Sequence, residues 1–197
     1  MNFWDDRYRV DEYVYGTEPN DFLREAAPRI PPGSVVCLAD GEGRNAVFLA
    51  SLGHRVTSVD LSMEGLRKAE RLAQQRGVDI EFVHADLADY DLPGALSGIV
   101  SIFTHVPPTI RARIHAQSPN ALVEGGAFVL EAYRPEQLAF DTGGPRNAAL
   151  LPTLQELEQE LRPLDLVVAR AVERDIHEGI FHGGRSATVQ VIGVKRA

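Results

Sequence analysis

The loop Asp40-Gly41-Glu42-Gly43 is the feature that most constrains this chain. An apolar run precedes the loop, a helix-like segment follows it, and the next apolar run ends in Asp60. Glycines let the backbone turn tightly and approach a ligand, and the amides at a helix N-terminus point at that ligand. A carboxylate at the end of the next strand can accept both hydroxyls of a ribose. The loop therefore predicts an α/β sheet that holds an adenosine-containing cofactor.

Strand and helix signals alternate after this loop. Expected strands cover residues 34–39, 55–60, 80–86, 98–103 and 127–132, and expected helices cover 44–52, 62–77 and a segment that begins at Pro107-Pro108. Regular alternation of this kind predicts a Rossmann-like, doubly wound parallel sheet with helices on both faces.

The two ends of the chain have a different pattern. Helix-like spacing covers residues 2–12, and Asn20 is a candidate N-cap for a helix that ends before Pro28. Thr153-Leu154-Gln155-Glu156 reads as a capping box for a helix to about Leu161. Residues 166–176 and 187–194 are β-rich and predict an antiparallel hairpin at the sheet edge. We interpret residues 1–197 as a single domain, with 1–30 as an N-terminal helical lid segment and 164–197 as a C-terminal β-hairpin.

Composition narrows the class of protein. The net charge of −8 and only two lysines argue against nucleic acid as a partner. No apolar run approaches the ~20 residues that cross a bilayer, and the acidic N-terminus is unlike a signal peptide. Cys37 is the only cysteine, which excludes an intrachain disulfide and a cysteine-based metal site. We expect a cytoplasmic protein whose partner is a small-molecule substrate, with no membrane partner.

The glycine loop alone does not identify the cofactor. Gly41-x-Gly43-x-x-Ala46, with Asp60 further on, also fits the dinucleotide fingerprint. Three features favour S-adenosylmethionine over NAD. First, Asp86 follows the third expected strand, where it can meet an adenine amino group. Second, the last expected element is a hairpin with no substrate domain after it. Third, no set of residues suited to hydride transfer is evident.

The motifs of this chain resemble those of a known family. It is similar to the class I S-adenosylmethionine-dependent methyltransferases and, among them, to the small bacterial group related to tellurite-resistance and thiopurine methyltransferases. The resemblance extends over nearly the whole chain. The residues that carry it are Phe3-Trp4-Asp5-Asp6-Arg7-Tyr8, Tyr13-Val14-Tyr15-Gly16-Thr17-Glu18-Pro19-Asn20, Gly41-Glu42-Gly43-Arg44-Asn45-Ala46-Val47-Phe48-Leu49-Ala50, Val59-Asp60-Leu61-Ser62, His84-Ala85-Asp86-Leu87 and Glu131-Ala132-Tyr133.

The resemblance implies a seven-stranded sheet whose last strand is antiparallel. It implies S-adenosylmethionine as cofactor and S-adenosylhomocysteine as product. Gly41 and Gly43 would pass under the methionine part, Asp60 would take the ribose hydroxyls, and Asp86 with the Leu87 amide would take the adenine. The other residues expected at the cofactor are Trp4, Ala39, Asp40, Asn45, Leu61, Ser62, Phe103 and Thr104.

The chain departs from the family pattern at two positions. Cys37 and Ala39 stand where the family usually has an acidic residue and a glycine. Loss of a carboxylate removes one partner of the positively charged cofactor, and Asp40 is placed to replace it in part.

Candidate residues for the acceptor side lie after the strand ends. His105 and Tyr133 are the catalytic candidates, and Tyr15, Arg134, His177 and His182 are the substrate candidates. His177 and His182 do not form the metal motif His-Glu-x-x-His, so no metal site is expected.

Methyl transfer from a sulfonium is an in-line displacement in which proximity and alignment lower the barrier. A thiolate or a chalcogen oxyanion needs no base, so the predicted function is methylation of a small molecule, with such soft nucleophiles as candidates. An NAD-dependent oxidoreductase and a non-catalytic binding protein of the same fold are the alternatives.

Overall fold

The structure is a computed structural model that describes residues 2–140 and 142–196. A seven-stranded sheet in the order β3-β2-β1-β4-β5-β7-β6 forms its centre. The strands are β1 Ser34–Leu38, β2 Arg55–Asp60, β3 Ile80–His84, β4 Leu96–Ile102, β5 Leu122–Tyr133, β6 Asp165–Glu178 and β7 His182–Val194. Neighbours from β3 to β5 are parallel, and β7 is antiparallel to both β5 and β6. The predicted Rossmann-like sheet with an antiparallel last strand is confirmed.

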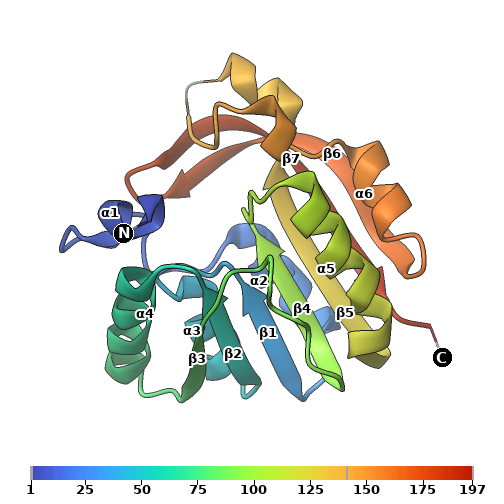
Figure 1. Ribbon diagram of the computed structural model, residues 1–197, viewed down its shortest axis with the longest axis horizontal. Helices are drawn as coiled ribbons and strands as arrows, with labels where there is room; N and C mark the ends of the chain where they lie inside the picture. Colours follow the sequence, from blue (N-terminus) through green and yellow to red (C-terminus); the bar gives the residue numbers. More distant parts are fainter. Residues whose placement is uncertain (1, 141, 197) are drawn as a thin grey trace.

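Helices cover both faces of this sheet (Figure 1). They are α1 Phe3–Tyr8, α2 Asp21–Ala26, α3 Arg44–Ser51, α4 Met63–Arg76, α5 Pro108–Ala121 and α6 Leu154–Glu160, with the short 3₁₀ turns η1 Ala27–Arg29, η2 Pro135–Ala139 and η3 Ala148–Leu150.

Strand β1 shows how the two faces arise. Val36 and Leu38 are buried with side chains of α5 and α6, whereas Val35 and Cys37 are buried with side chains of α2 and α3. Successive side chains of a strand point to opposite faces, so a continuous apolar run such as this one requires cover on both sides.

The predicted helix caps are present. The side chains of Asn20, Ser62 and Thr153 each accept a backbone N–H from the first turn of α2, α4 and α6, and Thr153 with Glu156 forms the full capping box. These signals depend only on neighbours in the chain, which is why the sequence predicts them well.

Several boundaries differ from the expectation. Helix α1 ends at Tyr8 instead of near Glu12, because the ammonium of Lys68 binds the carbonyls of Val10 and Glu12 and holds that segment in a non-helical path. Strand β5 starts directly after α5 at Leu122, not at Ala127, with an irregular register near its start.

The C-terminal hairpin is longer than predicted. Its pairing continues to Glu178 opposite His182, so the turn consists only of residues 179–181. Figure 1 shows the hairpin arching over the sheet toward α1, and the amide of Ile180 donates to the carbonyl of Val14 at 2.8 Å. Two segments far apart in the sequence therefore meet above the carboxyl ends of the parallel strands.

The strand order reverses between β1 and β4, and in open α/β sheets ligands bind at such a point. Within the part of the chain that the structure describes, no helix combines the length and the apolar character needed to span a bilayer.

Candidate functional site

A cavity of about 780 Å³ lies at this edge of the sheet. Its wall is built from the loops after β1, β2, β3 and β4, from α1, from residues 137–140 and 142–150 and from the β6–β7 turn. The volume is in the range that holds a cofactor or a drug-sized molecule. Thirteen predicted site residues line it: Trp4, Tyr15, Ala39, Asp40, Asn45, Asp60, Leu61, Asp86, Leu87, Phe103, Thr104, His105 and His182.

Asp60 is the best-oriented acidic group in the wall. Its Oδ2 accepts the amide of Gly41 and its Oδ1 accepts the amide of Ser62, both at 2.7 Å. Burial raises the pKa of Asp60, and the two amide hydrogen bonds oppose that shift. Because a carboxylate oxygen can accept more than one hydrogen bond, each oxygen keeps capacity for a ligand hydroxyl. The arrangement suits a vicinal diol such as that of ribose.

Gly41 and Gly43 do not line the cavity, and both have positive φ. A Cβ on Gly41 would lie 2.5 Å from the hydroxyl of Tyr8, and one on Gly43 would lie 2.5 Å from the Cβ of Ala69. The glycines thus let the loop turn and let α1 and α4 pack against it. Their predicted contact with the cofactor stays a prediction.

Asp40 lies inside the loop and lines the same wall. Its Oδ2 accepts the Ala46 amide at 3.3 Å and the Ser58 hydroxyl at 3.2 Å. Burial is the largest cause that raises the pKa of Asp40 to about 7, and the negative charge of Asp60 adds to it. A cation in the cavity would favour the ionised form of this group.

The departure at Ala39 has a visible consequence. Ala39 has φ of 47° and Phe103 has φ of 53°, values that suit glycine better than residues with a Cβ. The two residues follow the adjacent strands β1 and β4, so the wall between the parallel strands contains two strained backbone positions.

The remaining cofactor candidates lie on both sides of Asp60. Asp86 is exposed in the wall, and its Oδ1 accepts the amide of Ala88 at 2.8 Å. Thr104 donates its hydroxyl to the carbonyl of Leu38 at 2.9 Å, which fixes the end of β4 against β1. Ser62 lies outside the wall, where its hydroxyl donates to Asp5 and caps α4.

A buried ion pair behind the loop was not predicted. The side chains of Glu42 and Lys68 are each 2% exposed, and they form an ion pair of 2.5 Å. The two oxygens of Glu42 also accept the amides of Val14 and Tyr15, each at 3.2 Å. The position of Glu42 between the two glycines was the only sequence signal. The pair fastens the N-terminal segment to the glycine loop.

Aromatic and histidine rings form the acceptor side of the cavity. The Phe103 ring stacks on Tyr133 with centroids 4.6 Å apart, and His105 stacks on the same tyrosine at 5.6 Å and 12°. The ring of His182 lies edge-on to Phe103 at 4.8 Å and 4.5 Å from the ring of Tyr15. Predicted residues from four separate parts of the sequence thus share one cluster.

Three of the acceptor-side candidates do not line the wall. Tyr133 is fully buried behind Phe103, so it can position neighbours but does not line the cavity. Arg134 pairs with Glu136 at 2.7 Å. His177 is exposed on β6, because strand alternation turns its neighbours Ile176 and Glu178 inward.

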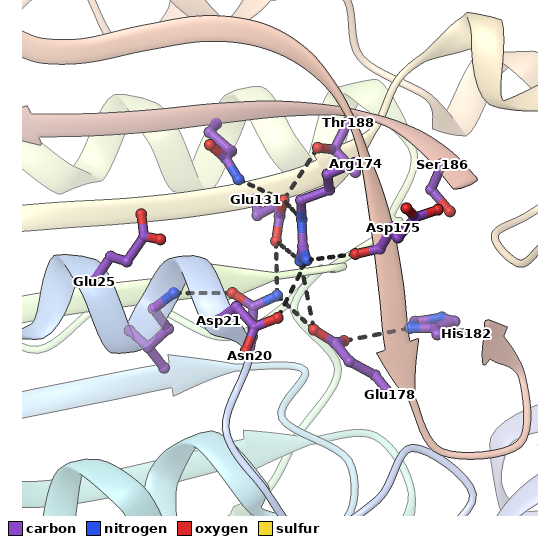
Figure 2. A network of polar contacts seen from close by, with 12 residues as sticks. Asn20, Asp21, Glu25, Glu131, Arg174, Asp175, Glu178, His182, Ser186 and Thr188 are labelled. Atoms are coloured by element: carbon purple, nitrogen blue, oxygen red, sulfur yellow. Dashed lines mark hydrogen bonds and ion pairs between the residues drawn. The ribbon is translucent and has the colours of Figure 1, made fainter. Parts of the chain in front are cut away.

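A buried polar network supports the hairpin (Figure 2). Glu131 is fully buried and accepts hydrogen bonds from Arg174, Thr188, Gln190 and Asn20 at 2.7–3.1 Å. The amide of Asn20 also donates to Glu178 at 2.9 Å.

Glu178 extends this network to the cavity. It pairs with Arg44 at 2.5 Å and lies 3.7 Å from Nδ1 of His182, which lines the wall. Although burial raises the pKa of Glu178, the nearby His182 ring and the Arg44 guanidinium outweigh it and lower that pKa to about 2. No sequence pattern indicated this network, because its members come from α2, β5, β6, β7 and α3.

Comparison with known proteins is consistent with this geometry. Residues 35–126 match the family described as a methyltransferase domain. No curated protein matches the sequence.

Solved structures share the fold. One similar structure comes from a study of the conversion of a disulfide bond into a thioacetal group during echinomycin biosynthesis. Its sequence is 14% identical and its TM-score is 0.78, and the alignment covers 98% of this chain and 90% of that one. TehB from Haemophilus influenzae is 17% identical with a TM-score of 0.76, over 98% of this chain and 66% of that one. The glycopeptide N-methyltransferase MtfA, in complex with S-adenosylhomocysteine, is 18% identical with a TM-score of 0.64, over 94% and 90% of the two chains.

The sheet order and these likenesses define the class I methyltransferase fold. The domain match over residues 35–126 agrees with this fold.

Proposed function

We propose that this chain transfers the methyl group of S-adenosylmethionine to a small molecule whose acceptor atom is a soft nucleophile, a thiol or a chalcogen oxyanion. The observation that carries the proposal is Asp60, whose two oxygens are each oriented by a backbone amide inside a cavity of about 780 Å³. The alternation of βα units positions such a carboxylate at the switch point of the sheet.

The residues of the wall fit the cofactor. Asp60 would accept the ribose hydroxyls, and Asp86 with the Leu87 amide would bind the adenine. Asp40 would face the positively charged end, and Trp4, which stacks on Tyr8 at 5.8 Å, would cover the cofactor from α1. When bound, the cofactor supplies an electrophilic methyl group on a sulfonium.

The acceptor would bind on the side of Phe103, His105 and His182. His105 is the group that would interact with the acceptor atom, and Tyr133 would orient the His105 ring from behind. Tyr15 and His182 would close this side, whereas Arg134 and His177 do not line the cavity.

A sulfur acceptor has additional support from the comparisons. One of the similar folds comes from work on the conversion of a disulfide bond into a thioacetal group, which is sulfur chemistry. Aromatic rings make favourable contacts with sulfur, and such rings surround His105 here.

Calorimetric titration with S-adenosylmethionine and S-adenosylhomocysteine tests the cofactor assignment. We expect binding by the wild type and, for Asp60→Asn, a loss of about 10- to 100-fold, because hydrogen bonds to a charged group contribute roughly 1.5–3 kcal/mol. Asp89→Asn, at an exposed position nearby, is the matched control and should bind normally.

Release of S-adenosylhomocysteine in the presence of thiols, selenite or tellurite tests the reaction. No cofactor binding at millimolar concentration would overturn the proposal, and NADH binding in its place would favour an oxidoreductase. Cofactor binding without transfer to any acceptor would indicate a non-catalytic protein of this fold.

A further inference from the structure

Helix α1 is attached to two different parts of the cavity wall. In the first attachment, Asp5 accepts the hydroxyl of Ser62 at 2.7 Å, and the side-chain amide of Asn2 donates to the carbonyl of Leu61 at 3.1 Å. These contacts join α1 to the loop between β2 and α4. Asp60 directly precedes this loop, and its Oδ1 accepts the amide of Ser62. The first attachment therefore lies beside the proposed ribose site.

The second attachment is made by the side chain of Arg7. Its guanidinium lies 4.8 Å from the centroid of the Phe3 ring in α1 and 4.6 Å from that of the Phe181 ring in the β6–β7 turn. A cation over the face of an aromatic ring is attracted by the ring quadrupole. Nη1 of Arg7 also donates to the hydroxyl of Tyr15 at 2.8 Å. Arg7 thus joins α1, the segment that follows it and the turn.

The partners of Arg7 belong to the acceptor side of the cavity. The Tyr15 ring lies 4.5 Å from the ring of His182 and 6.2 Å from that of Phe181. All three side chains line the wall. A movement of Arg7 therefore changes the support of the acceptor side, although Arg7 itself belongs to α1.

The cofactor side contacts the same helix. Trp4 lines the cavity, stacks on Tyr8 at 5.8 Å and has its ring centroid 5.7 Å from the Arg7 guanidinium. A molecule that binds beneath Trp4 stabilises the position of α1 and, with it, the position of Arg7. Two sites that favour the same arrangement of one element stabilise each other.

The second attachment is weak enough to open. The rings of Phe3 and Phe181 are 63% and 44% exposed, and a cation–π contact at an exposed site is a modest interaction. The first attachment consists of hydrogen bonds, one of them to the carboxylate of Asp5, which makes it the firmer of the two. Opening at Arg7 therefore separates α1 from the turn while α1 stays on the β2–α4 loop.

We propose that Arg7 is a positioning residue that couples the two sides of the cavity. Cofactor bound beneath α1 holds the β6–β7 turn closed over the acceptor side through Arg7. This coupling rests on the proposed function, since it needs the cofactor beneath Trp4, and it goes beyond that function by linking cofactor binding to the shape of the acceptor side. Because coupling between sites is reciprocal, the closed turn also slows release of the cofactor.

Hydrogen exchange with and without S-adenosylhomocysteine tests the coupling. We expect the ligand to slow exchange at residues 60–65 and also at residues 179–183 of the turn. Arg7→Met keeps an apolar stem but has neither the charge nor the N–H groups. In this variant the slowing at 60–65 should remain, and the slowing at 179–183 should fall about fivefold. Arg9→Met is the matched control, because Arg9 follows the same helix, pairs with Asp6 at 3.3 Å and does not line the cavity.

Release of S-adenosylhomocysteine gives a second measurement. Trp4 is the only tryptophan of the chain, so its fluorescence reports release from beneath α1. We expect Arg7→Met to release the ligand about fivefold faster than the wild type and Arg9→Met to match the wild type. Phe181→Leu breaks the contact from the turn, without a change in α1, and should also speed release. The double variant should be no faster than Arg7→Met, because both substitutions remove the same contact.

The outcomes separate this coupling from the proposed function. Failure of S-adenosylhomocysteine to bind contradicts both. If the ligand binds, the coupling alone is overturned by any of three results, and the cofactor assignment stands. These results are no slowing of exchange in the turn of the wild type, equal slowing there in Arg7→Met and the wild type, and additive effects of the Arg7 and Phe181 substitutions on release.

Discussion

Asp40 and His105 line one cavity, and burial shifts the pKa of each toward the uncharged form. Neither shift can be seen in the residue types or their spacing. Asp40 has lost much of its hydration and lies near Asp60, so its carboxyl titrates near neutral pH. The protonation state of each of these residues is therefore set by desolvation and by neighbours from other strands.

Asp40 makes cofactor binding depend on pH. A sulfonium interacts best with the ionised carboxylate, so we expect affinity for S-adenosylmethionine to rise as the pH passes through about 7, by up to about tenfold between pH 6 and pH 8. Titration calorimetry at these two values measures the rise. S-adenosylhomocysteine, which lacks the sulfonium charge, should show a much smaller change, and Asp40→Asn should remove the difference between the two ligands. Equal pH dependence for both ligands would contradict this role.

The Asp40 carboxyl also affects the stability of the fold, and this effect has the opposite dependence on pH. Its folded-state pKa is raised above the ordinary value of 3.8, so the folded state binds the proton more tightly than the unfolded state. Its contribution to stability is fully present below about pH 4 and is lost as the pH rises through about 7.

At the scale of elements, two contacts hold the N-terminal segment over the cavity. The Glu42–Lys68 ion pair fastens residues 10–15 to the glycine loop, and the β6–β7 turn touches the same segment from the other side. A single substitution can remove either contact without removing the other.

Lys68→Met tests the ion pair. It leaves the Glu42 carboxylate buried without its cation, so we expect the free energy of unfolding to fall by about 3–5 kcal/mol. Denaturant unfolding measures this loss. Arg67→Met, which removes an exposed ion pair with Glu64 on the same helix, should change stability by less than about 1 kcal/mol. Similar effects of the two substitutions would show that the buried pair has no special role.

Gly179→Ala tests the turn. Gly179 has φ of 68°, and a Cβ there would lie 2.3 Å from the carbonyl oxygen of Val14, so the turn must move away from the N-terminal segment. We expect faster proteolysis within residues 9–16 and a lower unfolding midpoint. Gly183→Ala in the same hairpin meets no atom within 4 Å and should behave like the wild type. Unchanged proteolysis of Gly179→Ala would mean that the two segments do not depend on each other.

At the scale of the whole molecule, the network around Glu131 joins parts of the chain that are far apart in sequence. Glu131 of β5 binds Asn20 at the start of α2 and Arg174 of β6 (Figure 2). Through the ion pair of Glu178 with Arg44 the network also reaches α3. Because these groups are buried, each is expensive to leave unpaired.

Glu131→Gln should lower the free energy of unfolding by about 3 kcal/mol or more. An amide offers one acceptor oxygen in place of two and brings an N–H₂ group against the donors of Asn20 and Arg174. Chemical unfolding measures the loss. Glu124→Gln, at an exposed position of the same strand, serves as the control and should be nearly neutral. If the free energy of unfolding of Glu131→Gln lies within about 0.5 kcal/mol of that of the control, the network does not contribute to stability as predicted.

Much of the fold and part of the site could be predicted from local signals. The apolar runs, the caps at Asn20, Ser62 and Thr153, and the spacing from the glycine loop to Asp60 depend on neighbours in the chain. His177 and Arg134 do not line the cavity, and their substrate roles stay predictions, because their place relative to the cavity depends on strand alternation and on pairing in the hairpin. The interpretation of residues 1–197 as one domain stays a prediction.

The sequence by itself determined the order of strands and helices and the loop at the switch point, because periodicity, turns and caps are short-range effects. Only the tertiary structure decided that Glu42 pairs with Lys68, that Glu131 gathers Asn20 and Arg174, and that burial lowers the pKa of His105 to about 4. The reason is physical. Ion pairing and desolvation depend on which groups meet in three dimensions, and the residues that meet here come from opposite ends of the chain.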